Sequence, residues 1–271
     1  MTTGLSLNPA GCDGPLLLEA ARRAEAAGFD AVWCYDHLSG AVLGADHCLE
    51  VWSTLGAIAA VTERVQLGPL VANVTTRPAA HLATAAASLQ SLSGGRLRLG
   101  LGAGASEPSP FAVEMTMFHL EQDGAADRRA RVAETIAFLR ALWSGESSFA
   151  GRWSSFDDLR GIGAPNPPCP IIVGANGPKM ARLAGLMAEG VNVHSFEADV
   201  QGLLAVAQAA AAEVGRVGFT ASVEAPLEPA WVDPDGPDRR RLAAAGVDEV
   251  VLAWSAGLGL AAIDEAGRHL P

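Results

Sequence analysis

Residues 63–104 read ERVQLGPLVANVTTRPAAHLATAAASLQSLSGGRLRLGLGAG, and this stretch decides the fold. Two short apolar runs, Val65–Val71 and Leu97–Leu101, flank a segment of helical length and periodicity, Ala79–Leu92. A nearly continuous apolar run is typical of a strand that is covered on both faces, as in a parallel sheet. The stretch therefore predicts a strand–helix–strand unit with parallel strands.

The same alternation continues in both directions along the chain. The predicted strands are Gly4–Leu7, Ala31–Tyr35, Val65–Val71, Leu97–Leu101, Pro170–Val173, Val191–His194, Phe219–Val223 and Glu249–Ala253. The predicted helices are Asp13–Gly28, Leu49–Val61, Ala79–Leu92, Asp127–Trp143, Pro178–Ala188, Val200–Val214, Pro237–Ala245 and Ala261–His269. Eight such units are what an α/β fold of the (β/α)8 TIM-barrel type needs, and we expect one domain over residues 1–271. A doubly wound sheet is the alternative.

The amino-acid composition restricts the kinds of molecule that the protein can bind. The chain has 30 acidic and 19 basic side chains, a formal charge of −11, which opposes binding to nucleic acid. The apolar stretches are much shorter than the roughly 20 residues of a membrane span, and the N-terminus has no basic-then-apolar leader. We therefore expect a soluble, cytoplasmic protein that acts on a small molecule, without nucleic acid or membrane.

Three further features of the sequence carry structural expectations. The four cysteines form no CxxC pair and have no histidine at zinc-finger spacing, which predicts free thiols and no metal site. The basic run Arg239–Arg241 reads as a solvated helix face. The long irregular segments Gly102–Ala126 and Gly145–Pro168 read as lids or partner surfaces.

In a barrel, chemistry collects where the strands end. The second strand runs into Asp36 and His37, and a histidine there can exchange a proton near neutral pH. The alternative is a histidine that only bonds a loop carbonyl. His194 and Trp254 follow the sixth and eighth strands and are candidates for the substrate wall, with a capped histidine and a core aromatic as their alternatives.

The third and fourth predicted strands contain glycine and proline residues that bear on where a ligand could lie. Pro69 removes a ladder hydrogen bond from the third strand, so we expect a bulge at Gly68-Pro69, with backbone that lies flat against a ligand ring and a candidate cis bond. A proline tolerated at a strand kink is the alternative. On the fourth strand, Gly100, Gly102 and Gly104 leave room for a flat ligand or a bulky neighbour, whereas Arg98 predicts a structural ion pair near the barrel floor.

The segment Gly174-Ala175-Asn176-Gly177-Pro178-Lys179 opens a helix after the fifth strand. A glycine-rich turn at a helix start exposes amides, and the helix dipole adds positive potential, so the site suits an anion. Lys179 is the only lysine in the chain, and a lysine in a first turn is unfavourable unless an anion lies there. This pattern predicts a phosphate site, with an ordinary helix cap as the alternative.

Five stretches, in order from Ala27 to Asn192, resemble the bacterial luciferase-like flavin and deazaflavin oxidoreductases. They are AGFDAVWCYDHL, STLGAIAAVTERVQLGPLV, TTRPAAHLATAAASLQSLSGGRLRLGLGAG, ETIAFLRALWSGESSFAGRW and PPCPIIVGANGPKMARLAGLMAEGVN. The resemblance implies a TIM barrel that holds a flavin-like ring at its strand ends and, in the deazaflavin branch, coenzyme F420 as the hydride carrier. The alternatives are an FMN-dependent monooxygenase of the same fold and a cofactor-free barrel that serves as a binding or structural subunit.

The resemblance also implies roles for particular residues. Asp36 and His37 would lie beside the ring, with His37, oriented by Asp36, handling the proton that accompanies hydride transfer. The bulge at Gly68-Pro69 would back the ring, Ala103-Gly104 would end the fourth strand beside it, and Gly174, Ala175, Asn176, Gly177, Pro178 and Lys179 would hold the phosphate. A homodimer is compatible with these residues, which do not fix the oligomeric state.

The sequence departs from the family pattern at two places. Ala105 and Ser106 stand where the family often has tryptophan and asparagine, and Val191 stands where it has tryptophan. Both changes reshape the pocket, so the substrate class cannot be carried over from the family.

Overall fold

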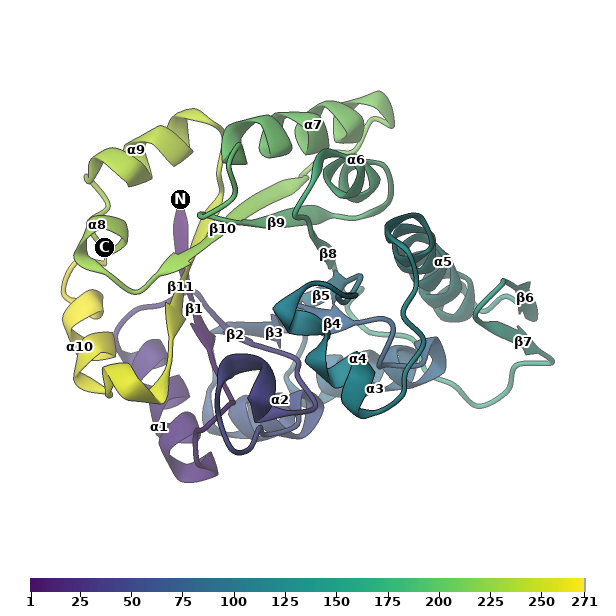
Figure 1. Cartoon of the computed structure of the whole chain (residues 1–271), viewed down its shortest axis with the longest axis horizontal. Coiled ribbons are helices and arrows are strands. Elements are labelled where there is room, and N and C mark those ends of the chain that lie inside the picture. The colour runs from purple at the N-terminus through teal and green to yellow at the C-terminus, as the bar shows by residue number, and fades with distance from the viewer. Residues whose placement is uncertain (271) are drawn as a thin grey trace.

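The computed structural model describes residues 1–270 and shows strands inside a ring of helices (Figure 1). Nine strands form one sheet in the order β3-β2-β1-β11-β10-β9-β8-β5-β4, and every pairing between them is parallel. They are β1 (Thr2–Leu7), β2 (Ala31–Cys34), β3 (Gln66–Pro69), β4 (Ala72–Asn73), β5 (Leu99–Gly102), β8 (Ile171–Gly174), β9 (Gly190–His194), β10 (Thr220–Pro226) and β11 (Glu249–Trp254).

The sheet closes on itself. β3 and β4 are two pieces of one extended segment that stand at opposite ends of the strand order, and a parallel bridge joins Leu67 to Leu97 across the remaining gap. Counted as one strand, the two pieces complete a barrel of eight. The predicted (β/α)8 barrel is confirmed, and the doubly wound sheet is excluded.

The predicted helices surround the barrel. They are α1 (Gly14–Ala26), α2 (Val51–Val61), α3 (Ala79–Leu92), α5 (Ala125–Ser144), α6 (Pro178–Met187), α7 (Val200–Glu213), α9 (Pro237–Ala244) and α10 (Ala261–Gly267). Local signals set their starts: the Asp13 carboxylate accepts a hydrogen bond from the Leu16 amide at 2.7 Å, and Pro15 lies in the first turn of α1.

The two long irregular segments differ in location. The first, 102–126, contains a short 3₁₀ helix (Pro110–Ala112) and α4 (Val113–Met117), and it contributes side chains to the cavity described below. The second forms a hairpin of β6 (Ser148–Ala150) and β7 (Ser155–Asp157), which lies on the far side of α5 from the barrel (Figure 1). Phe149 and Phe156 pack edge-on against Phe138 of α5 at 5.5 and 5.3 Å between ring centroids. Of the two, only the first segment lines the cavity, and we refer to residues 102–126 as the lid.

The third strand corrects the sequence prediction. Pairing with β2 continues through Gly68 and Pro69, and the interruption falls at Leu70 and Val71, between β3 and β4. The cis peptide bond is Leu70–Val71, not Gly68–Pro69. The amide of Leu70 donates to the Cys34 carbonyl at 2.8 Å, so pairing with β2 does not need the N–H that Pro69 lacks.

The floor of the barrel holds the predicted ion pair. Arg98 Nη1 lies 2.7 Å from Glu249 Oε2, and Trp33 Nε1 donates to the other carboxylate oxygen at 3.2 Å. The guanidinium carbon of Arg98 lies 4.7 Å from the centroid of the Trp33 ring. Both carboxylate oxygens of the buried Glu249 thus have a partner inside the wall, as a buried acid requires.

The basic run near the C-terminus is only partly solvated. Arg240 and Arg241 are exposed, but Arg239 is buried, and its Nη2 donates to Thr3 Oγ1 of β1 at 2.8 Å. The prediction of a solvated face is wrong for Arg239, because α9 places this position against the barrel floor.

Other expectations concern cysteines, metals and membranes. The four cysteines are free thiols, as predicted. Within residues 1–270 no three His, Cys, Asp or Glu side chains gather as metal ligands would. No helix in the same range has the length and apolar character of a membrane span.

Candidate active site

A cavity of about 1060 Å³ opens at the carboxyl ends of the strands. Ten of the residues predicted for the site line it, namely Asp36, His37, Ala103, Gly104, Gly174, Asn176, Gly177, Pro178, Lys179 and His194. They come from the ends of β2, β5, β8 and β9 and from the start of α6. The topology thus brings together segments that lie far apart in the sequence, as the barrel predicts.

Gly68 and Pro69 do not line the cavity, which corrects their predicted contact with a ring. A Cβ at Gly68 would lie 1.9 Å from the Arg98 carbonyl, so this glycine permits the close approach of a neighbouring backbone. Leu70 and Val71 line the cavity in their place. A Cβ at Gly102 would lie 2.2 Å from the Val71 side chain, so a bulky neighbour fills this glycine's space.

Ala175 and Trp254 also lie outside the cavity lining. Ala175 is fully buried, and its amide donates to the Asn192 carbonyl at 2.8 Å. Trp254 is buried in the hydrophobic core and donates from Nε1 to the Gly259 carbonyl at 2.9 Å. Trp254 is therefore a core aromatic rather than part of a substrate wall, because its side chain is buried among core residues.

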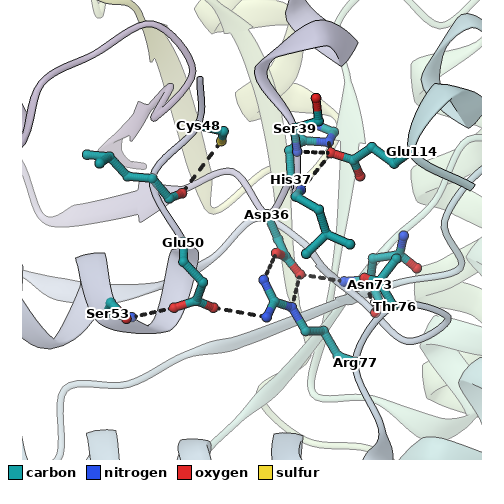
Figure 2. A network of polar contacts seen from close by, with 12 residues as sticks. Asp36, His37, Ser39, Cys48, Glu50, Ser53, Asn73, Thr76, Arg77 and Glu114 are labelled. Carbon is teal, nitrogen blue, oxygen red and sulfur yellow. Dashed lines mark hydrogen bonds and ion pairs between the residues drawn. The ribbon is translucent and has the colours of Figure 1, made fainter. Parts of the chain in front are cut away.

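Asp36 is held by an arginine rather than by its neighbour His37 (Figure 2). Arg77 donates to both carboxylate oxygens, from Nη2 to Oδ1 at 2.7 Å and from Nε to Oδ2 at 3.3 Å, and the Asn73 amide donates to Oδ2 at 3.0 Å. Arg77 also pairs with Glu50 at 3.0 Å. The hypothesis that Asp36 orients the imidazole is wrong, because these donors occupy its carboxylate. The sequence analysis missed Arg77, which follows two threonines at the turn before α3.

His37 instead faces a carboxylate from the lid. Its Nδ1 lies 3.6 Å from Glu114 Oε1 of α4, and the same oxygen accepts hydrogen bonds from the amides of Leu38 and Ser39 at 2.6 and 2.7 Å (Figure 2). With Nδ1 beside this acid, Nε2 is the ring nitrogen left to exchange a proton with a molecule in the cavity. Glu114 was also missed, because a lone acid in an irregular segment gives no local signal.

The pKa of Glu114 reflects this docking. Burial by itself would raise the pKa of the carboxyl group. The His37 side chain and the amides of Ser39 and Leu38 favour the charged form more strongly, so the pKa is lowered below its ordinary value. Glu114 is therefore an anion at neutral pH that joins the lid to the loop after β2.

A second imidazole–carboxylate pair lies across the strand ends. His194 Nδ1, at the end of β9, is 2.8 Å from Glu224 Oε2 in β10, and Ser6 Oγ donates to the other oxygen of Glu224 at 2.7 Å. Burial, followed by the charge of Glu224, raises the pKa of the adjacent Tyr35 hydroxyl. The signal for Glu224 was available, since a carboxylate interrupts the apolar strand TASVEAP.

One wall of the cavity is cationic. Lys179 lies in the first turn of α6, whose cap residue Gly177 offers no side chain to the exposed amides. Arg128 and Arg129, near the N-terminus of α5, line the cavity as well, and Arg128 Nη1 donates to Ser106 Oγ. The Nε of Arg128 is buried without a hydrogen-bond partner among the described residues. Cations and helix N-termini together suit an anionic group.

The structure is a (β/α)8 barrel with a cavity at the carboxyl ends of its strands, where barrels of this kind hold their ligands. The chain belongs to the luciferase-like monooxygenase family, whose sequence model matches residues 13–266. The match confirms the family membership that the resemblance of the sequence predicted.

Individual relatives are oxidoreductases that use F420. The chain is 35% identical over 213 residues to an F420-dependent hydroxymycolic acid dehydrogenase from Mycobacterium tuberculosis, an alignment that covers 78% of this chain and 58% of the relative. It is 39% identical over 170 residues to an F420-dependent glucose-6-phosphate dehydrogenase from Beutenbergia cavernae, which covers 62% of this chain and 48% of the relative. The chain therefore spans only about half of the length of these curated relatives.

Solved structures agree on the fold. An F420-dependent secondary alcohol dehydrogenase in complex with an F420–acetone adduct superposes with a TM-score of 0.83 at 19% identity, over 100% of this chain and 99% of the other. The F420-dependent tetrahydromethanopterin reductase from Methanopyrus kandleri gives 0.78 at 19% identity, over 99% and 98% of the two chains.

Proposed function

We propose that the protein is an F420-dependent oxidoreductase that transfers a hydride between coenzyme F420 and a small organic alcohol or carbonyl compound. The observation that carries the proposal is the polarity of the cavity: a cationic wall on one side, and two imidazole–carboxylate pairs at the strand ends. The F420-dependent relatives support the same cofactor.

The residues fit the cofactor. Its phosphate would be held by Lys179, by the amides at the start of α6 and by Arg128, whose buried Nε has no protein partner among the described residues. Leu70 and Val71, with Ala103 and Gly104 beside them, would form the wall against the ring. Hydride exchange is the chemistry that F420 supplies when it is bound.

The chain's own residues supply the proton chemistry. In the oxidation of an alcohol, Nε2 of His37 would accept the hydroxyl proton, and a bound cofactor would supply the hydride acceptor. A carbonyl group forms, and in the reverse direction His37 returns the proton to the oxygen. Glu114 stabilises the imidazolium that forms, and Asp36 positions the loop after β2 through Arg77.

An FMN-dependent monooxygenase is the second candidate. The family takes its name from that activity, and the cationic wall suits the phosphate of either cofactor. The experiment that separates them is a fluorescence titration of the purified protein with F420 and, separately, with FMN. We expect saturable binding with higher affinity for F420.

Each other outcome of the titration has a definite meaning. Tighter binding of FMN would move the protein to the monooxygenase class, and binding of neither would favour a cofactor-free barrel. The same samples give the oligomeric state by light scattering, for which a homodimer is our expectation.

A further inference from the structure

We infer that the substrate is an uncharged alcohol or carbonyl compound with a large apolar body. The inference rests on the proposed function and adds the substrate class to it. Three properties of the cavity carry it: where its cations lie, which carboxylates line the rest, and which apolar side chains stand at its mouth.

The cations of the cavity lie together at one wall. Arg128, Arg129 and Lys179 lie near the N-termini of α5 and α6, where the proposed function puts the cofactor phosphate. Elsewhere in the lining contributed by residues 1–270 there is no lysine or arginine. Once the cofactor occupies its wall, no cation remains for a second anionic group.

The remaining charged groups of the lining are acids and their histidine partners. Glu114 and Glu224 are each 4% exposed and lie beside His37 and His194, and Glu228 stands exposed at the rim before α8 (Pro229–Val232). Asp36 is neutralised by Arg77. A phosphate or carboxylate on the substrate would meet carboxylates without a compensating cation, which is unfavourable in a partly buried site.

The mouth of the cavity is apolar. Three large side chains from three segments line it while remaining open to water: Phe111 at 52% exposed, Phe196 at 74% and Leu258 at 48%. Phe196 stacks on His194 with 4.7 Å between ring centroids, so apolar surface continues directly from a polar group of the site. Large apolar surface gathered around a cavity marks a binding site for an apolar ligand.

The size of the cavity leaves room for this second molecule. At about 1060 Å³ it is at the upper end of what single small-molecule sites use, roughly 300–1,000 Å³. The hydroxyl or carbonyl oxygen of the substrate lies against the imidazoles, and its body extends past Phe196 toward Phe111 and Leu258. His194, Phe196 and Leu258 are then specificity-determining residues.

The test uses protein loaded with oxidised F420, so that the cationic wall is occupied. Methyl ketones from butanone to decanone, which the oxidised cofactor cannot convert, are titrated by calorimetry beside alkyl phosphates and alkylamines of matched length. We expect the dissociation constant of the ketones to fall about fourfold per added methylene until the cavity is filled. At each chain length the phosphates should bind more weakly than the ketones.

Two variants sharpen the test. Phe196→Ala should reduce the dependence of ketone affinity on chain length. Phe118→Ala is the control: it also removes an exposed phenylalanine, but one outside the cavity lining, so it should leave that dependence unchanged. Glu228→Lys should bring the phosphates closer to the ketones in affinity, because it adds a cation at the rim.

Several results would overturn the inference. One is tighter binding of the alkyl phosphates or alkylamines than of the ketones. Another is an affinity for ketones that does not change with chain length. Such results with F420 bound would leave the proposed function standing. Failure of the protein to bind F420 would instead refute the proposed function, and the inference would fall with it.

Discussion

The floor and the mouth of the barrel both contain a buried carboxylate beside a nitrogen-bearing side chain, but the two sets of contacts are built differently. At the floor, Arg98, Glu249 and Trp33 satisfy one another inside the wall. At the mouth, His37 and His194 each face a buried carboxylate on one side and the cavity on the other. Buried carboxylates thus pair with an arginine inside the wall at one end and with imidazoles that line the cavity at the other, as expected for the stability face and the site face of a TIM barrel.

The contacts at the mouth also connect different kinds of structural element from those at the floor. The floor pair links residues at the starts of two strands, which the sheet itself holds in place. The mouth pair His37–Glu114 links a strand-end loop to the lid, so its geometry depends on the docking of α4. Substitutions at the mouth should therefore change turnover and ligand affinity, and substitutions at the floor should change stability.

The largest effect is expected for His37→Ala. Turnover should fall by roughly 10² to 10⁴, because general acid–base groups contribute on that scale, while the affinity for F420 stays near that of the parent. Steady-state kinetics with a cognate substrate and a fluorescence titration measure the two quantities. His81→Ala, at an exposed position on α3, is the matched control. Full turnover in His37→Ala would remove the proton role.

Arg98→Met tests the other end of the barrel. The change leaves Glu249 buried without its cation, so the free energy of unfolding should fall by about 3–5 kcal/mol. Urea denaturation measures it, with Arg182→Met as the control, since the pair of Arg182 with Glu213 is exposed and contributes little to stability. The folded fraction should still bind F420. A large loss of cofactor affinity with unchanged stability would contradict the division between floor and mouth.

Lys179→Ala should weaken F420 binding by roughly 1.5–3 kcal/mol, the contribution of one charge-assisted hydrogen bond, with little change in Tm. Arg182→Ala removes a cation from the same helix but outside the cavity lining, so it controls for net charge. Titration by fluorescence and a thermal melt give the two readings. Equal affinity in Lys179→Ala and the parent would remove the phosphate assignment.

The smallest effect is a pH dependence at Glu114. Because the folded-state pKa of this carboxyl group lies below its ordinary value of 4.5, its charged form stabilises the protein above that pH. The contribution should be lost as the pH falls through the folded-state pKa. Glu114→Gln should cost about 1 kcal/mol at neutral pH and converge with the parent in acid. Urea denaturation from neutral to acid pH measures this, and parallel curves would show that the carboxylate does not hold the lid.

The fold could be predicted from the sequence because its signals are local. The apolar runs and the helical periodicity of residues 63–104 lie within one short segment, and the barrel consists of eight successive strand–helix pairs of this kind. The sequence predicts that Arg98 has an acidic partner, because an arginine at an inward position of a strand requires one. It does not identify that partner as Glu249.

The site could be predicted only in outline. The strand-end rule located His37 and Lys179, but the partners Arg77 and Glu114 lie 41 and 77 positions from Asp36 and His37, and loop conformation alone brings them together. Glycine at position 68 was misread because a missing side chain admits a neighbouring backbone as readily as a ligand. Trp254 was misread because the end of a strand does not tell which way its last side chain points.

The most direct test of the account is a crystal structure of the protein with F420. We expect the phosphate at Gly177–Lys179, beside Arg128, and the ring in the strand-end cavity next to His37, with Val71 behind it. A ring bound elsewhere, or a phosphate that does not contact the first turn of α6, would contradict the assignment of this cavity as the active site.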